Sequence, residues 1–134
     1  MAVHNPYQSY QTNAVQTASP GELTLMLYNG CIKFIKLARK AIEENNIPEK
    51  NTNLQKAQKI IQELMVTLDM KYEVSKNLMS LYDYMNRRLI EGNVKNDIVI
   101  LDEVEAFVTE LRDTWKEVIK QNRIQQYGQG GVVL

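Results

Sequence analysis

The sequence has few of the residues that build catalytic or metal sites, since its 134 residues include one histidine, His4, and one cysteine, Cys31. A di-iron helical bundle needs Glu-x-x-His motifs, and a serine or cysteine nucleophile needs a histidine base, so neither site is expected. One cysteine cannot form an internal disulfide, and Cys31 is better explained as a small buried apolar residue than as a nucleophile. The sequence also lacks a phosphate-binding glycine loop. We therefore expect no cofactor, no metal and no enzymatic activity.

The chain lacks an excess of charge of either sign, because 16 Lys and Arg residues stand against 16 Asp and Glu residues. Nucleic-acid binding is not expected, since it draws much of its affinity from neutralising phosphates. Without a signal-peptide pattern or an apolar run long enough to cross a bilayer, we expect no membrane insertion and a cytosolic location. A small enzyme working through Arg87, Arg88 or Arg112 is the weaker alternative, because surface arginines are usually solvated or salt-bridged.

Helical periodicity, in contrast, covers most of the chain. The first helix is expected to begin at a capping box, with Ser19 as N-cap, Pro20 at the first helical position and Glu22 three residues after the cap. From Leu23 to Ile42 its polar side chains fall within an arc of about 140°. Nearly everything else on this helix is apolar.

The first helix therefore carries two apolar stripes. The main seam contains Leu23, Leu27, Gly30, Phe34, Leu37 and Ala41, and the second stripe contains Leu25, Tyr28, Ile32, Ile35 and Ile42. One interpretation is a central helix buried against several neighbours. The other is that the second stripe is a binding groove that a removable segment covers in the free protein. Residues 1–18 are the candidate cover, because Tyr7, Tyr10 and Ala14 share one face of a helix too short to be stable alone in water.

Three further helices are expected, one opening at Pro48, one from about Ser75 to Gly92, and one capped by Asn96 or Asp97. Their apolar stripes are Leu54, Ala57, Ile61, Leu64 and Leu68; Leu78, Leu81, Tyr82, Met85 and Leu89; and Leu101, Val104, Val108, Leu111, Trp115 and Val118. Short connections favour antiparallel neighbours. The prediction is an all-α fold, an antiparallel up-down four-helix bundle over residues 19–123, between the N-terminal segment 1–18 and a flexible glycine-rich tail, 124–134.

Several separated motifs resemble those of the FliS family of export chaperones for flagellin. In chain order they are the run from Tyr10 through Thr17-Ala18-Ser19-Pro20-Gly21-Glu22-Leu23 to Met26-Leu27-Tyr28-Asn29-Gly30, then Leu81-Tyr82-Asp83-Tyr84-Met85-Asn86-Arg87-Arg88-Leu89, Asn96-Asp97, and Leu111-Arg112-Asp113-Thr114-Trp115-Lys116. The similarity covers about residues 5–120. It implies a bundle that binds the disordered C-terminal segment of flagellin in the cytosol, prevents premature polymerisation and delivers it to the flagellar type III export apparatus. Export-gate and flagellar regulatory proteins are further implied partners.

A disordered client loses conformational entropy on binding, so a useful affinity requires a long apolar interface. Tyr82, Met85 and Trp115 lie on main stripes and are interpreted as core. The predicted client-binding residues are Tyr7, Tyr10, Leu25, Tyr28, Ile32, Ile35, Met79 and Tyr84. Two questions stay open: whether residues 1–18 are a displaceable lid or a direct client contact, and whether the second stripe is instead used in a homodimer of a self-associating structural protein.

Overall fold

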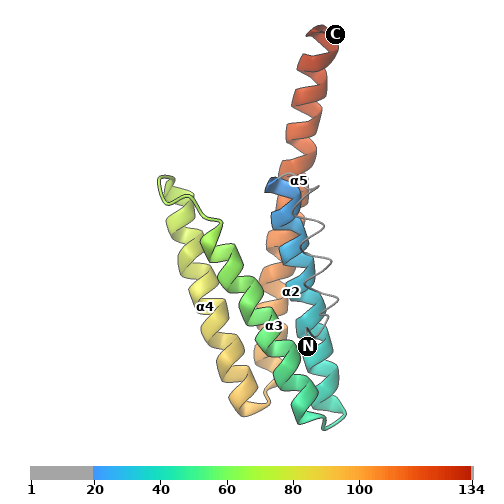
Figure 1. The fold of residues 1–134 in the computed structure, drawn as a ribbon, viewed down its shortest axis with the longest axis vertical. Coiled ribbons are helices and arrows are strands. Elements are labelled where there is room, and N and C mark those ends of the chain that lie inside the picture. The colour runs from blue at the N-terminus through green and yellow to red at the C-terminus, as the bar shows by residue number, and fades with distance from the viewer. Residues whose placement is uncertain (1–19, 134) are drawn as a thin grey trace, which may run out of the picture.

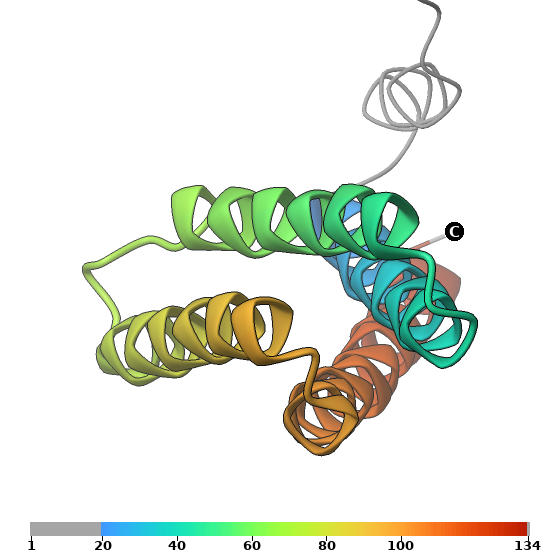
Figure 2. The ribbon, with the colours of Figure 1, turned by 90° about the horizontal axis from the view of Figure 1, so that it is seen from below.

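The part of the chain that the structure describes forms four antiparallel helices. The computed structural model describes the backbone of residues 20–133 and the side chains of residues 21–124. The helices are α2 (Pro20–Glu43), α3 (Ile47–Val66), α4 (Glu73–Lys95) and α5 (Ile98–Val133), and the described residues contain no strand. Each helix packs against two neighbours, α2 and α4 both lying between α3 and α5 (Figures 1 and 2). The predicted all-α, up-down four-helix bundle is confirmed.

The helix ends follow local sequence chemistry. Asn46 caps α3, because its side chain accepts a hydrogen bond of 3.2 Å from the backbone N–H of Glu49. At the α4–α5 turn, the two candidate caps have different structural roles. Asn96 ends α4 in the left-handed region, with a φ of 51°, which asparagine tolerates better than most residues. The Asp97 carboxylate then accepts from the backbone N–H of Val99 at 2.9 Å and so caps α5.

The core is centred on α2, which contributes more buried apolar side chains than any other helix. Ile35 has no exposed surface and Ile32 is 5% exposed, and both belong to the core cluster. The central-helix interpretation therefore describes these two residues, whereas they were predicted to line a groove. The physical reason is that α2 packs against α3 and α5 at once, which uses both of its apolar stripes. Leu37, expected on the main seam, is instead exposed.

Cys31 lies inside this core with no exposed surface. Burial disfavours the thiolate and raises the pKa of the thiol to about 12. The interpretation of Cys31 as a small buried apolar residue is confirmed.

The pair formed by α3 and α4 diverges from the pair formed by α2 and α5 toward the α3–α4 connection. At the opposite end, α4 and α5 approach closely beside Gly92, where a Cβ atom would lie 3.0 Å from a Leu101 methyl carbon. From there α3 and α4 lean away from α2 and α5 (Figure 1). The helical backbone of α5 continues to Val133, and the boundary placed at residue 124 stays a prediction.

Candidate functional site

A groove of about 570 Å³ lies where α4 and α5 diverge. The first turns of α2 and the α3–α4 connection also contribute to its lining. Its apolar lining comprises Tyr28 of α2, Leu68 of the connection, Val74, Leu78, Leu81 and Tyr82 of α4, and Phe107, Leu111, Trp115 and Val118 of α5. Thr24, Thr67, Glu110 and Thr114 supply the polar part of the lining.

The groove follows from the lengths of the connections. Only residues 96 and 97 join α4 to α5, which holds the adjoining helix ends together, whereas residues 67–72 join α3 to α4. Helices fixed at one end can separate at the other. The apolar stripes of α4 and α5 therefore meet near the α4–α5 connection and part toward the α3–α4 connection (Figure 1). The stripe residues farthest from the short connection are therefore the ones left to line a groove.

Two buried tyrosines of the lining, Tyr28 and Tyr82, form what we call the groove floor. The hydroxyl oxygens of Tyr28 and Tyr82 lie 2.6 Å apart, and the side chains are 3% and 2% exposed. Burial raises the pKa of both phenols, and in Tyr82 the hydrogen bond with Tyr28 raises it further. Both groups are therefore neutral hydroxyls throughout the physiological pH range.

Trp115 joins α5 to the start of α2. Its indole N–H donates to the backbone oxygen of Gly21 at 2.8 Å, while its ring lines the groove. A buried or half-buried indole commonly combines apolar contact with one hydrogen bond in this way. Trp115 is therefore only partly the core residue that its place on the stripe predicts, because one side of the ring faces the groove.

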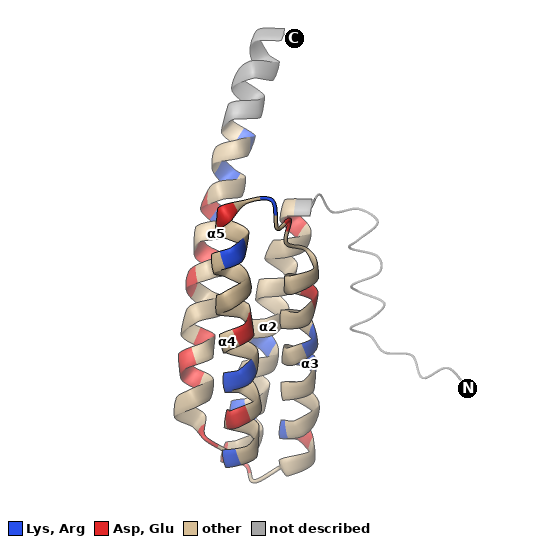
Figure 3. Ribbon diagram, turned by 90° about the vertical axis from the view of Figure 1, so that its left-hand side faces the viewer, with Lys and Arg blue, Asp and Glu red and all other residues tan. Residues whose placement is uncertain are grey.

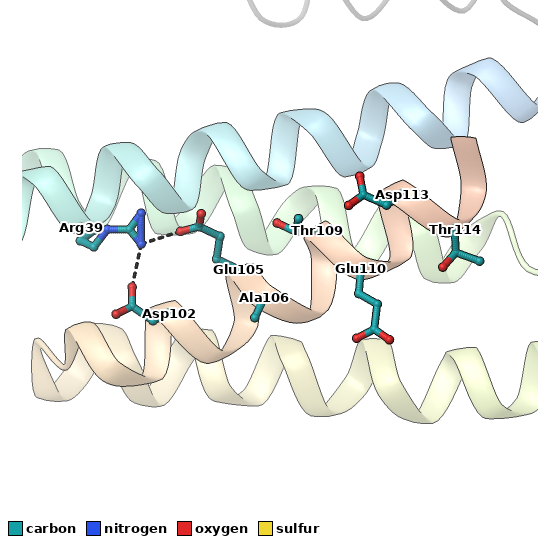
Figure 4. Close-up of a pocket in the computed structure, with 8 residues that line it drawn as sticks. All are labelled: Arg39, Asp102, Glu105, Ala106, Thr109, Glu110, Asp113 and Thr114. Carbon is teal, nitrogen blue, oxygen red and sulfur yellow. Dashed lines mark hydrogen bonds and ion pairs between the residues drawn. The ribbon is translucent and has the colours of Figure 1, made fainter. Parts of the chain in front are cut away.

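A polar furrow of about 560 Å³ runs beside the groove between α2 and α5. The guanidinium of Arg39 on α2 bridges the carboxylates of Asp102 and Glu105 on α5, with N–O distances of 2.7 and 2.5 Å (Figure 4). Glu110 lines both the furrow and the groove and so forms a carboxylate on their shared rim. The furrow therefore holds ion pairs between α2 and α5.

The arginines proposed for an enzyme alternative are engaged in ion pairs. Arg88 contacts Glu91 and Glu103 at 2.9 and 2.8 Å, and it holds the pKa of the Glu103 carboxyl below its usual range. Arg87 pairs with Asp83, and Arg112 with Asp113. Along α4, basic and acidic positions alternate (Figure 3). Within the described part of the chain, no cluster of three or more His, Cys, Asp or Glu side chains is arranged to hold a metal ion.

Comparison with known proteins identifies the family. The family model described as "Flagellar protein FliS" matches residues 3–122. The chain belongs to the FliS family of flagellar secretion chaperones. It is similar to the flagellar secretion chaperone FliS of Bacillus subtilis (strain 168), with 55% identity over 98% of this chain and 99% of the relative. The FliS proteins of Escherichia coli (strain K12) and Salmonella typhimurium are 40% and 35% identical, over 78% and 85% of this chain and 79% and 87% of theirs.

Membership of this chaperone family confirms the resemblance read from the motifs and the prediction that the chain is not an enzyme. Across the described residues, every helix is too short or too polar to cross a membrane.

The predicted client-binding residues do not form one surface. Tyr28 lies on the groove floor, whereas Leu25 lines a separate hollow of about 380 Å³ with Ile119 and basic residues of α5. Met79 and Tyr84 are half-buried on α4 outside the groove. Tyr84 donates to Glu103 at 3.0 Å and meets Phe107 edge to face. Ile32 and Ile35 lie in the core as described above, and Tyr7 and Tyr10 lie outside the described residues.

The groove residues that sequence reasoning missed were all visible as apolar positions. The residues assigned to core stripes were Leu68, Leu78, Leu81, Tyr82, Leu111, Trp115 and Val118, and Val74 and Phe107 were given no role. What these residues share is their distance from the two-residue α4–α5 connection. Those on α4 lie in its first half, near the longer α3–α4 connection, and those on α5 lie two or more turns into the helix. Stripe periodicity identifies the apolar face of a helix, but the divergence of two helices decides which part of that face stays open.

Proposed function

We propose that this protein is a cytosolic export chaperone that binds the disordered C-terminal segment of flagellin. Binding would keep flagellin from polymerising prematurely and deliver it to the flagellar type III export apparatus, where an export-gate component and regulatory proteins are further partners. Membership of a family of flagellar secretion chaperones supports this role. The single structural observation that carries it is the apolar groove between α4 and α5.

The groove suits an amphipathic segment of a client. Its walls are leucine, valine and aromatic side chains from two diverging helices, the arrangement in which a third helix can lay down its apolar face. Val74 is 61% exposed and Val118 38% exposed, so part of the lining is accessible in the free protein. A segment that folds on binding loses conformational entropy, and burial of this apolar surface offsets that loss.

Charge substitutions at the accessible valines test the proposal. Calorimetric titration of the full chain with the flagellin C-terminal segment should show binding that Val74→Glu and Val118→Glu each weaken at least tenfold, because a carboxylate would have to be desolvated in the groove. Val94→Glu and Val99→Glu are matched controls on the same two helices, since both valines are exposed and lie outside the groove. Equal loss in all four variants, or no binding by the unmodified protein, would refute the proposal.

Residues 1–18 are part of the same proposal as a displaceable cover. Tyr7 and Tyr10 would occupy apolar surface beside Tyr28 in the free protein and leave when the client binds. A short amphipathic segment of weak helix formers suits this role, because its docking free energy is small enough to be overcome. Self-association is the competing use of the groove, and sedimentation without a client at increasing concentration distinguishes it.

A further inference from the structure

The tyrosine pair on the groove floor has one more hydrogen-bond donor than it uses. Tyr28 and Tyr82 bring two hydroxyl protons, and the 2.6 Å contact between their oxygens uses one of them, whichever residue donates. Among the residues that the structure describes, no acceptor is placed to take the second proton. Both hydroxyls belong to side chains that are at least 97% buried, given exposed fractions of 3% and 2%.

While the groove is open, water can accept this second proton, and the donor loses that partner when an apolar segment fills the groove. Buried polar groups almost always have a hydrogen-bond partner, and leaving one without a partner costs its full desolvation. Burial also raises the pKa of both phenols, so the proton cannot be lost to relieve the mismatch at physiological pH. The two residues line the groove. A client segment that fills the groove and displaces its water must therefore supply the acceptor.

We propose that the spare hydroxyl of the Tyr28–Tyr82 pair donates a hydrogen bond to an uncharged polar side chain, Asn, Gln, Ser or Thr, embedded in the apolar face of the bound client. This inference rests on the proposed function, and it adds a rule for choosing the client segment. A segment with an acceptor at this position satisfies the donor, whereas a wholly apolar segment leaves it buried without a partner and is disfavoured.

The chemistry of the groove limits which client groups can accept this hydrogen bond. The backbone carbonyls of a helical client are occupied within its own helix, so the acceptor belongs to a side chain. A carboxylate would lose its hydration among apolar walls and would face the negative charge of Glu110 on the rim. Neutral amide and hydroxyl oxygens meet the donor without either penalty.

The double variant Tyr28→Phe/Tyr82→Phe tests the inference, because it keeps both rings and removes both hydroxyls. Its affinity for the flagellin C-terminal segment, measured by calorimetry on the full chain, should fall fivefold to tenfold, about 1 to 1.4 kcal/mol. Its melting temperature should change little, because replacing both partners of a buried hydrogen bond by apolar groups of the same shape is nearly neutral. Each single variant should lose less affinity than the double variant, because the remaining hydroxyl can donate to the client.

Tyr72→Phe is the matched control, since Tyr72 is 63% exposed in the α3–α4 connection and does not line the groove. It should change neither affinity nor melting temperature. Alanine substitution of each Asn, Gln, Ser and Thr of the client segment completes the test. One substitution should weaken binding to the unmodified chaperone and have no effect on binding to the double variant.

The outcomes separate this inference from the proposed function. If Val74→Glu weakens binding but the double variant binds as tightly as the unmodified protein, the groove binds the client and the hydroxyl rule is wrong. A lower melting temperature with unchanged affinity would show that the pair only stabilises the bundle, which also overturns the rule. Failure of the unmodified protein to bind the segment would remove the proposed function and the inference together.

Discussion

Leu25 and Ile32 show at the scale of single residues how one apolar stripe divides between the surface and the core. Both lie on the second stripe of α2, yet Ile32 is buried, whereas Leu25 is half-buried in a hollow that also contains Lys116, Lys120 and Arg123. A glutamate at position 32 would be an unpaired charge in the core, but at position 25 it would lie beside Lys116 and Lys120 in a hollow where Arg123 already pairs with Glu22.

We therefore expect Ile32→Glu to unfold the bundle at room temperature and Leu25→Glu to remain folded. Far-UV circular dichroism and a thermal melt of each variant provide the measurement. A cooperative melt of Ile32→Glu near that of the unmodified protein would show that the core is open at this point and would restore the predicted groove along α2.

The burial of Cys31 predicts how the stability of the fold and the reactivity of the thiol depend on pH. Its folded-state pKa of about 12 lies above the ordinary value for a cysteine, so the unfolded chain releases this proton first as pH rises. The corresponding stability is complete below the ordinary thiol pKa and is lost as pH rises toward the folded-state value. Alkylation by iodoacetamide at pH 8 to 9 should consequently be slow in the folded protein and fast in denaturant. Equal alkylation rates in the two states would contradict the burial of the thiol.

At the scale of helices, Lys50 fastens the start of α3 to the end of α4. Its side chain is 4% exposed, and its ammonium donates to the backbone oxygen of Asn93 at 2.9 Å and to the side-chain oxygen of Asn96. A cation at this position also compensates the negative end of the α4 dipole. Sequence periodicity cannot identify such a residue, because its partners are brought together only when the two helices pack.

Lys50→Met should lower the free energy of unfolding by about 1 to 3 kcal/mol, since it keeps the aliphatic stem but leaves two half-buried acceptors without their charged donor. Lys95→Met is a suitable comparison, because Lys95 is exposed and pairs only with Glu91 one turn away; its effect should stay within about 0.5 kcal/mol. Urea denaturation of both variants measures the difference. Similar midpoints for the two variants would show that the buried lysine contributes no more than a surface pair.

The elements differ in how far the sequence predicts them. Pro20 and Pro48 mark the starts of α2 and α3 because proline at a first turn is a local signal, and the Asn-Asp pair marks the α4–α5 turn for the same reason. Trp115 was assigned to the core because its stripe is continuous with Val104 and Val108. Whether a stripe residue is enclosed depends on the distance to the facing helix, which is a property of the assembled bundle and not of any one segment.

At the scale of the whole molecule, our proposal implies an equilibrium between molecules whose groove is covered by the N-terminal segment and molecules whose groove is uncovered. If residues 1–18 cover apolar surface around Tyr28, the client binds only the fraction of molecules in which that surface is uncovered, and the apparent affinity is reduced by that fraction. The cover would protect the free protein from association through the groove, because a continuous exposed apolar surface promotes self-association.

Deleting residues 1–16 should therefore tighten client binding severalfold and increase self-association, while Tyr10→Ala should act in the same direction more weakly. Calorimetry at a concentration where sedimentation shows the truncated protein to be monomeric measures the intrinsic affinity. Val74→Glu in the truncated protein serves as the control, because it should weaken binding whether or not the cover is present. If truncation instead lowers affinity tenfold or more, about 1.4 kcal/mol, then Tyr7 and Tyr10 contact the client directly and the segment is part of the binding surface.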